Sequence, residues 1–259
     1  MKVDFSTITV YEVIALVLSF IAIVVPFIKW SWYKWVVKPV LKHLPTGKVY
    51  PCFNMSGSYL KVESVFEALN KPITVKNIAL RMTRVRDEKK LNQNWSSFWS
   101  PVTQSFKEGF SSTSETAHPF RIEKDSLTTA FTEFEDPHNS LNRSLAEFEM
   151  ERDFFIKDCL DKMLDYRAAL DKFRESSMYK KMYDILLQEF FWSIGNYKIE
   201  IIVKYGKEKK VFSYNFDINE AEHNKLLHNL NETLIVPIKR AYQQRLDFSL
   251  VVLNLKIDD

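Results

Sequence analysis

The sequence predicts a mainly β protein with an α-helical insertion, placed behind one N-terminal transmembrane helix. Three observations lead to this fold class. Residues 13–28 carry no charged side chain, which is the composition of a membrane span. Between residues 57 and 257, several segments alternate apolar and polar side chains, which is the period of a half-buried β-strand. Residues 139–192 instead repeat apolar side chains every three or four positions, which is the period of an amphipathic helix.

The composition excludes several classes of protein. Hydrophobic residues make up 46% and aromatic residues 14% of the 259 residues, which is too apolar for a disordered chain. The five glycines are too dispersed for a phosphate-cradling loop, so a Rossmann or P-loop nucleotide fold is not expected. Cys52 and Cys159 alone are too few for a disulfide framework or a thiolate metal site. We therefore expect no cofactor and no metal.

The net charge of +3 is concentrated in one short segment. Residues 29–50 contain five lysines and no acid, whereas all residues after 50 together sum to −1. A nucleic-acid-binding domain usually has a dominant basic face, so no nucleic-acid partner is expected. Two smaller basic clusters, at residues 81–90 and 204–210, have the pattern of strand ends that run into solvated turns.

Residues 1–36 are the predicted anchor, with one transmembrane helix over about residues 10–30. The uncharged run would span about 24 Å, and the aromatic residues on both sides extend it toward the thickness of a hydrocarbon layer. A cleaved signal peptide fits less well, because lysines and tryptophans follow the apolar run directly. A buried core helix would rarely be apolar on every face and then flanked by lysines on one side only.

Lysines and aromatic residues directly after the span predict a contact with the lipid bilayer. Aromatic rings favour the headgroup level, and the lysines attract anionic headgroups. The excess of lysine on this side predicts a single-pass protein whose N-terminus is outside and whose C-terminal domain is cytoplasmic. The predicted interface residues are Lys29, Trp30, Trp32, Tyr33, Lys34, Trp35, Lys38 and Lys42.

Two polar residues in or beside the span suggest a second use of the helix. Ser19 lies inside the apolar run and Glu12 lies at its outer edge. In an oligomer these residues could line a narrow pore, since a polar group in a membrane helix is a candidate functional group. The simpler interpretation is that Ser19 bonds to its own helix and that Glu12 lies in headgroup water.

The chain after the anchor divides into two parts. Residues 37–56 are interpreted as a basic juxtamembrane connector, punctuated by prolines, that runs along the membrane surface. Residues 57–259 are interpreted as an antiparallel β-sandwich, in which a short helix begins at Asn219 and ends near Leu230. The predicted strands include residues 59–63, 78–83, 95–102, 120–134, 197–203, 211–216 and 248–257.

The helical insertion, at about residues 139–192, is predicted to be a long hairpin. One helix continues in phase from Leu141 to Phe173, and Ser176 and Ser177 separate it from a second helix over residues 178–192. The first arm would be about 50 Å long. Its free end could serve for oligomerisation or docking, and a lid over the sheet is an equally good interpretation.

Residues with catalytic or metal-binding chemistry are scattered along the chain. His223 and His228 are five positions apart, which does not place both rings on one helix face. Acidic residues gather at the end of one strand and along one helix face, where neighbouring lysines and arginines favour ion pairing over metal binding. These carboxylates are Glu133, Glu135, Asp136, Asp158, Asp161 and Asp165. No catalytic residue is therefore assigned, and an enzyme is not expected.

Several segments carry a family resemblance. Residues 59–62 followed by 73–80, then residues 195–199, an aromatic strand and the helix end at 226–231, resemble uncharacterised bacterial single-pass membrane proteins. The resemblance implies an immunoglobulin- or arrestin-like β-sandwich on the cytoplasmic side of a bacterial plasma (inner) membrane. Its members are similar to proteins found with bacterial defence genes, and it carries no catalytic residues over.

These observations favour a non-enzymatic, membrane-anchored protein for binding or assembly. A protein partner, or a second copy of the chain, would bind at an edge of the sandwich or at the helical hairpin. The alternative hypothesis is an oligomerising, membrane-disrupting effector of antiviral defence, whose anchors cluster into a pore.

Overall fold

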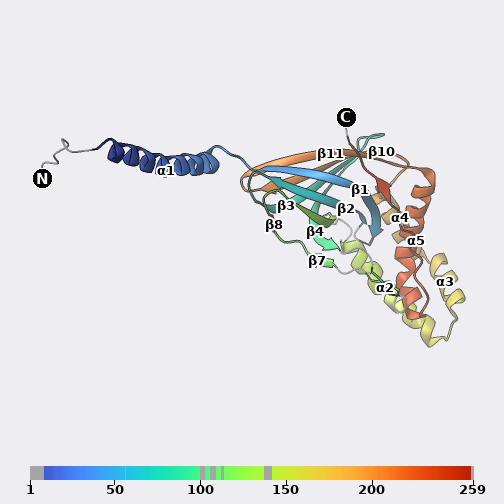
Figure 1. Ribbon diagram of the computed structural model, residues 1–259. Coiled ribbons are helices and arrows are strands. Elements are labelled where there is room, and N and C mark those ends of the chain that lie inside the picture. The colour runs from blue at the N-terminus through green and yellow to red at the C-terminus, as the bar shows by residue number, and fades with distance from the viewer. Residues whose placement is uncertain are drawn as a thin grey trace.

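The computed structural model describes residues 9–55, 57–99, 103–105, 109–111, 114–136 and 142–257. One apolar helix projects from a β-rich body, and the other helices gather at the opposite end of that body (Figure 1). Parts of four predicted segments lie outside the described residues: positions 1–8 of the anchor, 100–102 of a predicted strand, 139–141 of the insertion, and the last two residues.

Helix α1 spans Val10–Trp35. It begins after Thr9, whose backbone N–H and hydroxyl both donate to the Glu12 carboxylate, at 2.7 and 3.0 Å. Pro26 lies inside the helix without ending it. At 1.5 Å per residue α1 is about 39 Å long, and none of its side chains is buried against the rest of the protein.

Eleven strands form one sheet in the order β12-β1-β2-β9-β4-β3-β10-β11-β13, with β7 paired to β4 and β8 paired to β3. The pairings between these strands are antiparallel, and β5 and β6 form a separate pair. The long strands are β1 (Val40–Asn54), β2 (Gly57–Leu69), β3 (Ile73–Arg84), β4 (Lys90–Trp99), β9 (Ser126–Glu135), β10 (Gly195–Tyr205) and β11 (Glu208–Ile218). The short strands are β5 (Thr103–Ser105), β6 (Gly109–Ser111), β7 (Ser114–Thr116), β8 (Phe120–Ile122), β12 (Leu253–Asn254) and β13 (Lys256–Ile257).

The sheet curls until its two ends come close, which makes it nearly a barrel. Residues 253–257 bridge these ends, because β12 pairs with β1 at Lys48 and Val49 while β13 pairs with β11 at Tyr214 and Asn215. Nearer to α1, side chains make the link: His43 Nδ1 lies 2.6 Å from the Tyr214 hydroxyl. We call this stretch, between residues 40–46 of β1 and 208–214 of β11, the seam.

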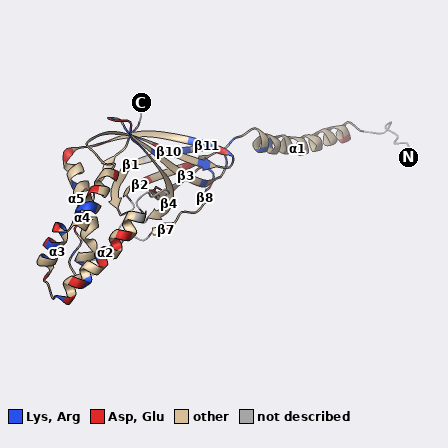
Figure 2. Ribbon diagram, turned by 180° about the vertical axis from the view of Figure 1, so that it is seen from behind, with Lys and Arg blue, Asp and Glu red and all other residues tan. Residues whose placement is uncertain are grey.

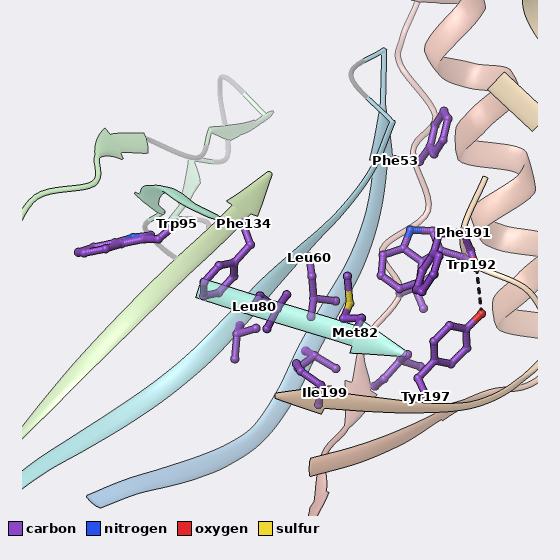
Figure 3. Close-up of a cluster of buried hydrophobic side chains, with 14 of the residues drawn as sticks. Phe53, Leu60, Leu80, Met82, Trp95, Phe134, Phe191, Trp192, Tyr197 and Ile199 are labelled. Carbon is purple, nitrogen blue, oxygen red and sulfur yellow. Dashed lines mark hydrogen bonds between the residues drawn. The ribbon is translucent and has the colours of Figure 1, made fainter. Parts of the chain in front are cut away.

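The core fills the curled sheet. Along β2 the inward side chains from Ser58 to Ala68 are buried in strict alternation with half-buried outward ones, which is the pattern of a sheet with one face on the core. The largest buried side chains meet where β10 begins, and Figure 3 shows Trp192 and Phe191 packed against Tyr197 there. The indole N–H of Trp192 donates to the Cys52 carbonyl at 2.7 Å, so its polar atom is satisfied inside the core.

Four helices complete the body at the end away from α1 (Figure 1). They are α2 (Asn142–Asp161), α3 (Tyr166–Glu175), α4 (Ser177–Glu189) and α5 (Glu220–Ala241). Helices α2, α3 and α4 pack on one another, and α5 also contacts β1. Asn219 begins α5 as expected, because its side chain accepts the Glu222 backbone N–H at 3.0 Å.

The antiparallel, β-rich body is confirmed, but its details differ from the expectation. A sandwich of two sheets was predicted, whereas the strands belong to one curled sheet. The segment 37–56, interpreted as a connector, contains β1, which pairs with β2 over residues 40–45 and 49–54. Its prolines were misleading because a strand tolerates a missing N–H at a bulge or beside an unpaired edge. Pro45 lies at a register shift, and Pro51 lies where, among the described residues, β1 pairs with β2 alone.

The helical region also differs. The predicted long helix breaks after Asp161, where Met163 takes a left-handed φ of 53° and Asp165 caps α3 by accepting the Ala168 N–H at 2.9 Å. The two pieces fold back on each other, with the Phe155 and Phe173 rings 5.5 Å apart. The apolar period alone continued in phase through the break, so it could not reveal the turn. Helix α5 runs to Ala241 instead of Leu230, and the predicted last strand is reduced to β12 and β13.

Candidate functional site

The candidate site is the end of the body that faces α1. Helix α1 is long and apolar enough to cross a membrane, with a mean hydropathy of 2.5 over its most apolar window. Its large side chains are exposed all round, as shown by Leu16 at 72%, Ile23 at 72% and Phe27 at 63%. Leaving this much apolar surface in water is unfavourable, at roughly 25 cal/mol for each Å².

The predicted interface residues divide among three elements. Lys29, Trp30, Trp32, Tyr33, Lys34 and Trp35 lie on the last turns of α1, Lys38 lies in the four-residue link 36–39, and Lys42 lies on β1. We call the six helix residues the collar. Within it the Lys34 ammonium lies 4.7 Å from the centre of the Trp30 ring and 5.6 Å from that of Trp35, which are cation–π distances.

The collar is tied to the body through the turn between β2 and β3. The Tyr33 hydroxyl donates to the Asn70 carbonyl at 2.9 Å, and Lys71 Nζ donates to the Lys34 carbonyl at 3.1 Å. The Asn70 side chain also donates to the Lys38 carbonyl at 3.2 Å, and Asn70 has the left-handed φ of 69° that asparagine tolerates well. These bonds hold the end of α1 close to the turn between β2 and β3.

A second set of lysines lies at the same end, from the turn between β10 and β11. Lys210 Nζ donates to the Leu41 carbonyl at 2.6 Å, which places the base of this hairpin beside the first residues of β1. The cluster at 204–210 was predicted to be a strand end that runs into a solvated turn, and the exposed turn between β10 and β11 confirms this. Its place beside α1 was not predicted. Which turn lies next to α1 depends on the strand order, and no local pattern reports that order.

The two polar residues of the span are both satisfied within α1. The Ser19 hydroxyl donates to the Ala15 carbonyl of its own helix at 2.8 Å, and Glu12 accepts both bonds from Thr9. Residues 12 and 19 are seven positions apart and so lie on nearly the same helix face. A role in a pore stays a prediction, while the observed bonds already account for both groups.

The seam is the second notable feature of this end. Within the described residues, no strand pairs with the outer edge of β1 over residues 40–46. The carbonyls of Leu41 and His43 on that edge accept bonds from Lys210 and Tyr214 instead. The His43 ring packs against the rings of Phe66 and Phe212, and this burial lowers the pKa of His43 to about 4.

Most of the other candidate groups have structural roles. His223 Nδ1 lies 2.7 Å from the Trp192 carbonyl and His228 Nε2 lies 2.8 Å from the Asp247 carbonyl, so these two rings hold separate loops. Asp158 pairs with Lys162 at 2.7 Å and with Lys172 at 3.5 Å. Among the described residues, no group of three metal-ligating side chains gathers.

The outer face of β2 and β9 carries one further polar cluster. Lys61 pairs with Glu133 at 3.5 Å, and Ser97 donates to the same carboxylate at 3.2 Å. Burial and the neighbouring Glu133 raise the pKa of Glu135. Burial also raises the pKa of the Cys52 thiol to about 11, which keeps it protonated and unreactive at neutral pH. These contacts join β2, β4 and β9 on the outer face of the sheet.

Comparison with known proteins adds no family assignment. No protein family, no curated protein and no solved structure matches the chain. We therefore infer the function from the geometry of the end that faces α1.

Proposed function

We propose that this protein is a single-pass membrane protein that binds a partner, or assembles with copies of itself, at the cytoplasmic face of a bacterial plasma membrane, without chemistry of its own. The observation that carries the proposal is α1: 26 residues, exposed on every face and fixed at one end to a well-packed body. A bilayer is the surrounding in which this exposed surface is stable, because lipid tails are as apolar as the helix.

The proposed orientation places the body in the cytoplasm. Both the collar and the hairpin at 204–210 carry lysine on the body side of α1, whereas Lys2 is the single lysine before it. Positive charge beside a span favours the cytoplasmic side. The expected immunoglobulin- or arrestin-like sandwich is kept here only as an analogy, in which a curled antiparallel sheet presents edges and loops for recognition.

The seam is the proposed place for a protein partner. An extended peptide could add to the outer edge of β1 at residues 40–46, as strands commonly add to exposed sheet edges. The edge is protected at present by Lys210 and Tyr214, which is how isolated edges avoid unwanted pairing. A partner strand would have to replace these two side-chain bonds, so binding would be selective rather than general.

Deletion of residues 1–35 tests the anchor. We expect the full chain to stay in the membrane fraction after alkaline extraction and the shortened chain to be soluble and folded. Protease protection of a tag at each terminus of the full chain reports the orientation. A full chain that alkali releases from membranes would contradict the proposal, as would a C-terminal tag on the outside.

Cells that express the full or the shortened chain also decide between this proposal and the pore-forming alternative. Dye uptake and membrane potential are measured in cells that express the full chain, the chain without residues 1–35, and the variants Ser19→Ala and Glu12→Gln. We expect intact membranes in all four. Depolarisation that requires α1 and weakens in the two variants would establish the pore instead.

A further inference from the structure

The narrow end of the body carries a concentration of positive charge that the sequence distributes over four separate segments. We define the rim as residues 38–42, 67–76, 121–127 and 204–210, which the strand pairing places at the end facing α1. The rim contains ten lysines and arginines and four acids, a net charge of +6, although the whole chain has only +3. Figure 2 shows these basic residues next to α1, whereas acidic residues predominate on α2 at the far end.

The hairpin of β10 and β11 brings part of this charge to the level of the link. Lys210 contacts Leu41, which lies six residues after Trp35, the last residue of α1. β11 leads away from this point, so Lys207 lies about 10 Å closer to α1 than Lys210, at about 3.3 Å per strand residue. The tip of the hairpin therefore reaches about the level of Lys38, in the link that follows the collar.

Part of the rim charge has no counter-charge in the protein. Lys42 pairs with Glu67, Arg121 pairs with Glu123 and Lys124 pairs with Asp125. Within the described part of the chain, no ion pair involves Lys76, Lys204, Lys207 or Lys209, and all four are exposed. Like charges held this close repel one another unless an external anion neutralises them.

Exposed apolar side chains accompany the lysines. Val211 on β11 is 47% exposed, Leu127 at the start of β9 is 62% exposed and Val40 at the start of β1 is 37% exposed. Lysines mixed with exposed aliphatic side chains are typical of a surface that lies in the headgroup region, where the ammonium groups meet phosphates and the aliphatic groups meet the upper acyl chains.

We propose that the rim is a second membrane-binding site, which holds anionic phospholipid headgroups against the body while α1 crosses the bilayer. The inference rests on the proposed anchoring by α1. The tie between Tyr33 and Asn70 keeps the rim within reach of the surface, and the Debye length of about 8 Å at physiological salt lets the lysines sense the surface charge. The site fixes the tilt of the body, and with it the direction in which the seam and the distal helices face.

The test uses the full chain in lipid nanodiscs, one set of phosphatidylcholine alone and one of three parts phosphatidylcholine to one part phosphatidylglycerol. Hydrogen exchange is measured at the backbone amides of residues 204–209. We expect several-fold slower exchange in the anionic discs. The difference should disappear at about 1 M salt, where the Debye length falls to about 3 Å.

Two matched double variants locate the effect. K207E/K209E reverses two rim charges, and we expect it to abolish the slowing. K180E/K181E makes the same change in net charge on two exposed lysines of α4, and we expect it to keep the slowing. Both pairs of lysines are exposed, so we expect neither double variant to change the melting temperature of the body. An unchanged melting temperature shows that a loss of the slowing is not caused by unfolding.

Three results would overturn the inference. Equal exchange in both kinds of disc would remove the rim site and leave the anchor intact. Release of the full chain by alkali, with none recovered in discs, would overturn the anchor and the rim together. Polynucleotide binding that K207E/K209E abolishes, with disc exchange unaffected, would show that the rim is a nucleic-acid surface instead.

Discussion

Helix α1 and the buried cluster around Trp192 are both strongly apolar, yet their surroundings are opposite. The side chains of α1 contact little except one another, while Trp192, Phe191 and Tyr197 are almost completely enclosed by the sheet and α5. Because apolar surface is unfavourable in water wherever it lies, the difference shows that the folded body satisfies its own core and that α1 needs a partner outside the chain. The residues that join these two regions are few, namely the collar, the link and the rim.

The largest expected effect is in the buried cluster around Trp192. Trp192→Ala removes a fully buried indole and leaves a cavity, so we expect the free energy of unfolding to fall by about 3–5 kcal/mol. Chemical unfolding of the full chain in detergent measures it. Trp32→Ala, at an exposed position of α1, is the control and should leave the unfolding of the body unchanged. If both variants lost the same free energy of unfolding, α1 and the buried cluster around Trp192 would not be energetically separate.

The seam predicts a dependence of stability on pH. Burial lowers the pKa of His43 from 6.5 to about 4 in the folded protein, so below pH 6.5 the unfolded chain takes up a proton that the folded chain does not. Stability is therefore complete above pH 6.5 and falls as the pH decreases toward 4, by about 3 kcal/mol in total. Below about pH 4 this contribution no longer changes.

The variant His43→Leu isolates this contribution from those of the carboxylates. The difference in unfolding free energy between wild type and variant is measured from pH 7 to pH 4. We expect the wild type to lose stability relative to the variant steadily as the pH falls. A difference that stays constant with pH would show that His43 does not titrate in the way its burial requires.

A smaller effect on stability is expected from removing one hydroxyl inside the core, that of Tyr197. This hydroxyl accepts the Ser193 N–H at 2.7 Å and lies 2.7 Å from the Ser193 carbonyl, so it holds the loop between α4 and β10. Tyr197→Phe removes the donor to the Ser193 carbonyl and one of the two acceptors of the Ser193 N–H, which also donates to the Phe191 carbonyl at 3.1 Å. It should cost about 1–3 kcal/mol in thermal unfolding. A variant as stable as wild type would mean that water replaces the hydroxyl.

The smallest expected effect is at the joint between the regions. Tyr33→Phe removes the bond to the Asn70 carbonyl, and an exposed bond of this kind contributes below about 1 kcal/mol. We expect unchanged unfolding of the body, but faster hydrogen exchange at residues 70 and 71, since the turn loses one of its ties to α1. Unchanged exchange would show that the Lys71 and Asn70 side-chain bonds hold the joint without Tyr33.

The sequence by itself determined the features that depend on local patterns. The apolar run of α1, the aromatic and lysine collar, the period-two strands and the Asn219 cap are all legible because each needs only residues near one another in the chain. The same local reasoning placed Ser19 correctly, since a hydroxyl in an apolar helix finds the carbonyl four residues earlier.

Tertiary structure decided everything that depends on which segments become neighbours. Pro45 and Pro51 argued against a strand at residues 37–56, but pairing with β2 outweighed that local preference. The turn at Met163 was hidden because folding α2 back on α3 buries the Phe155 and Phe173 faces against each other. The rim arises because the strand order brings four distant segments to one end of the sheet. The spacing of the lysines along the chain does not reveal that order.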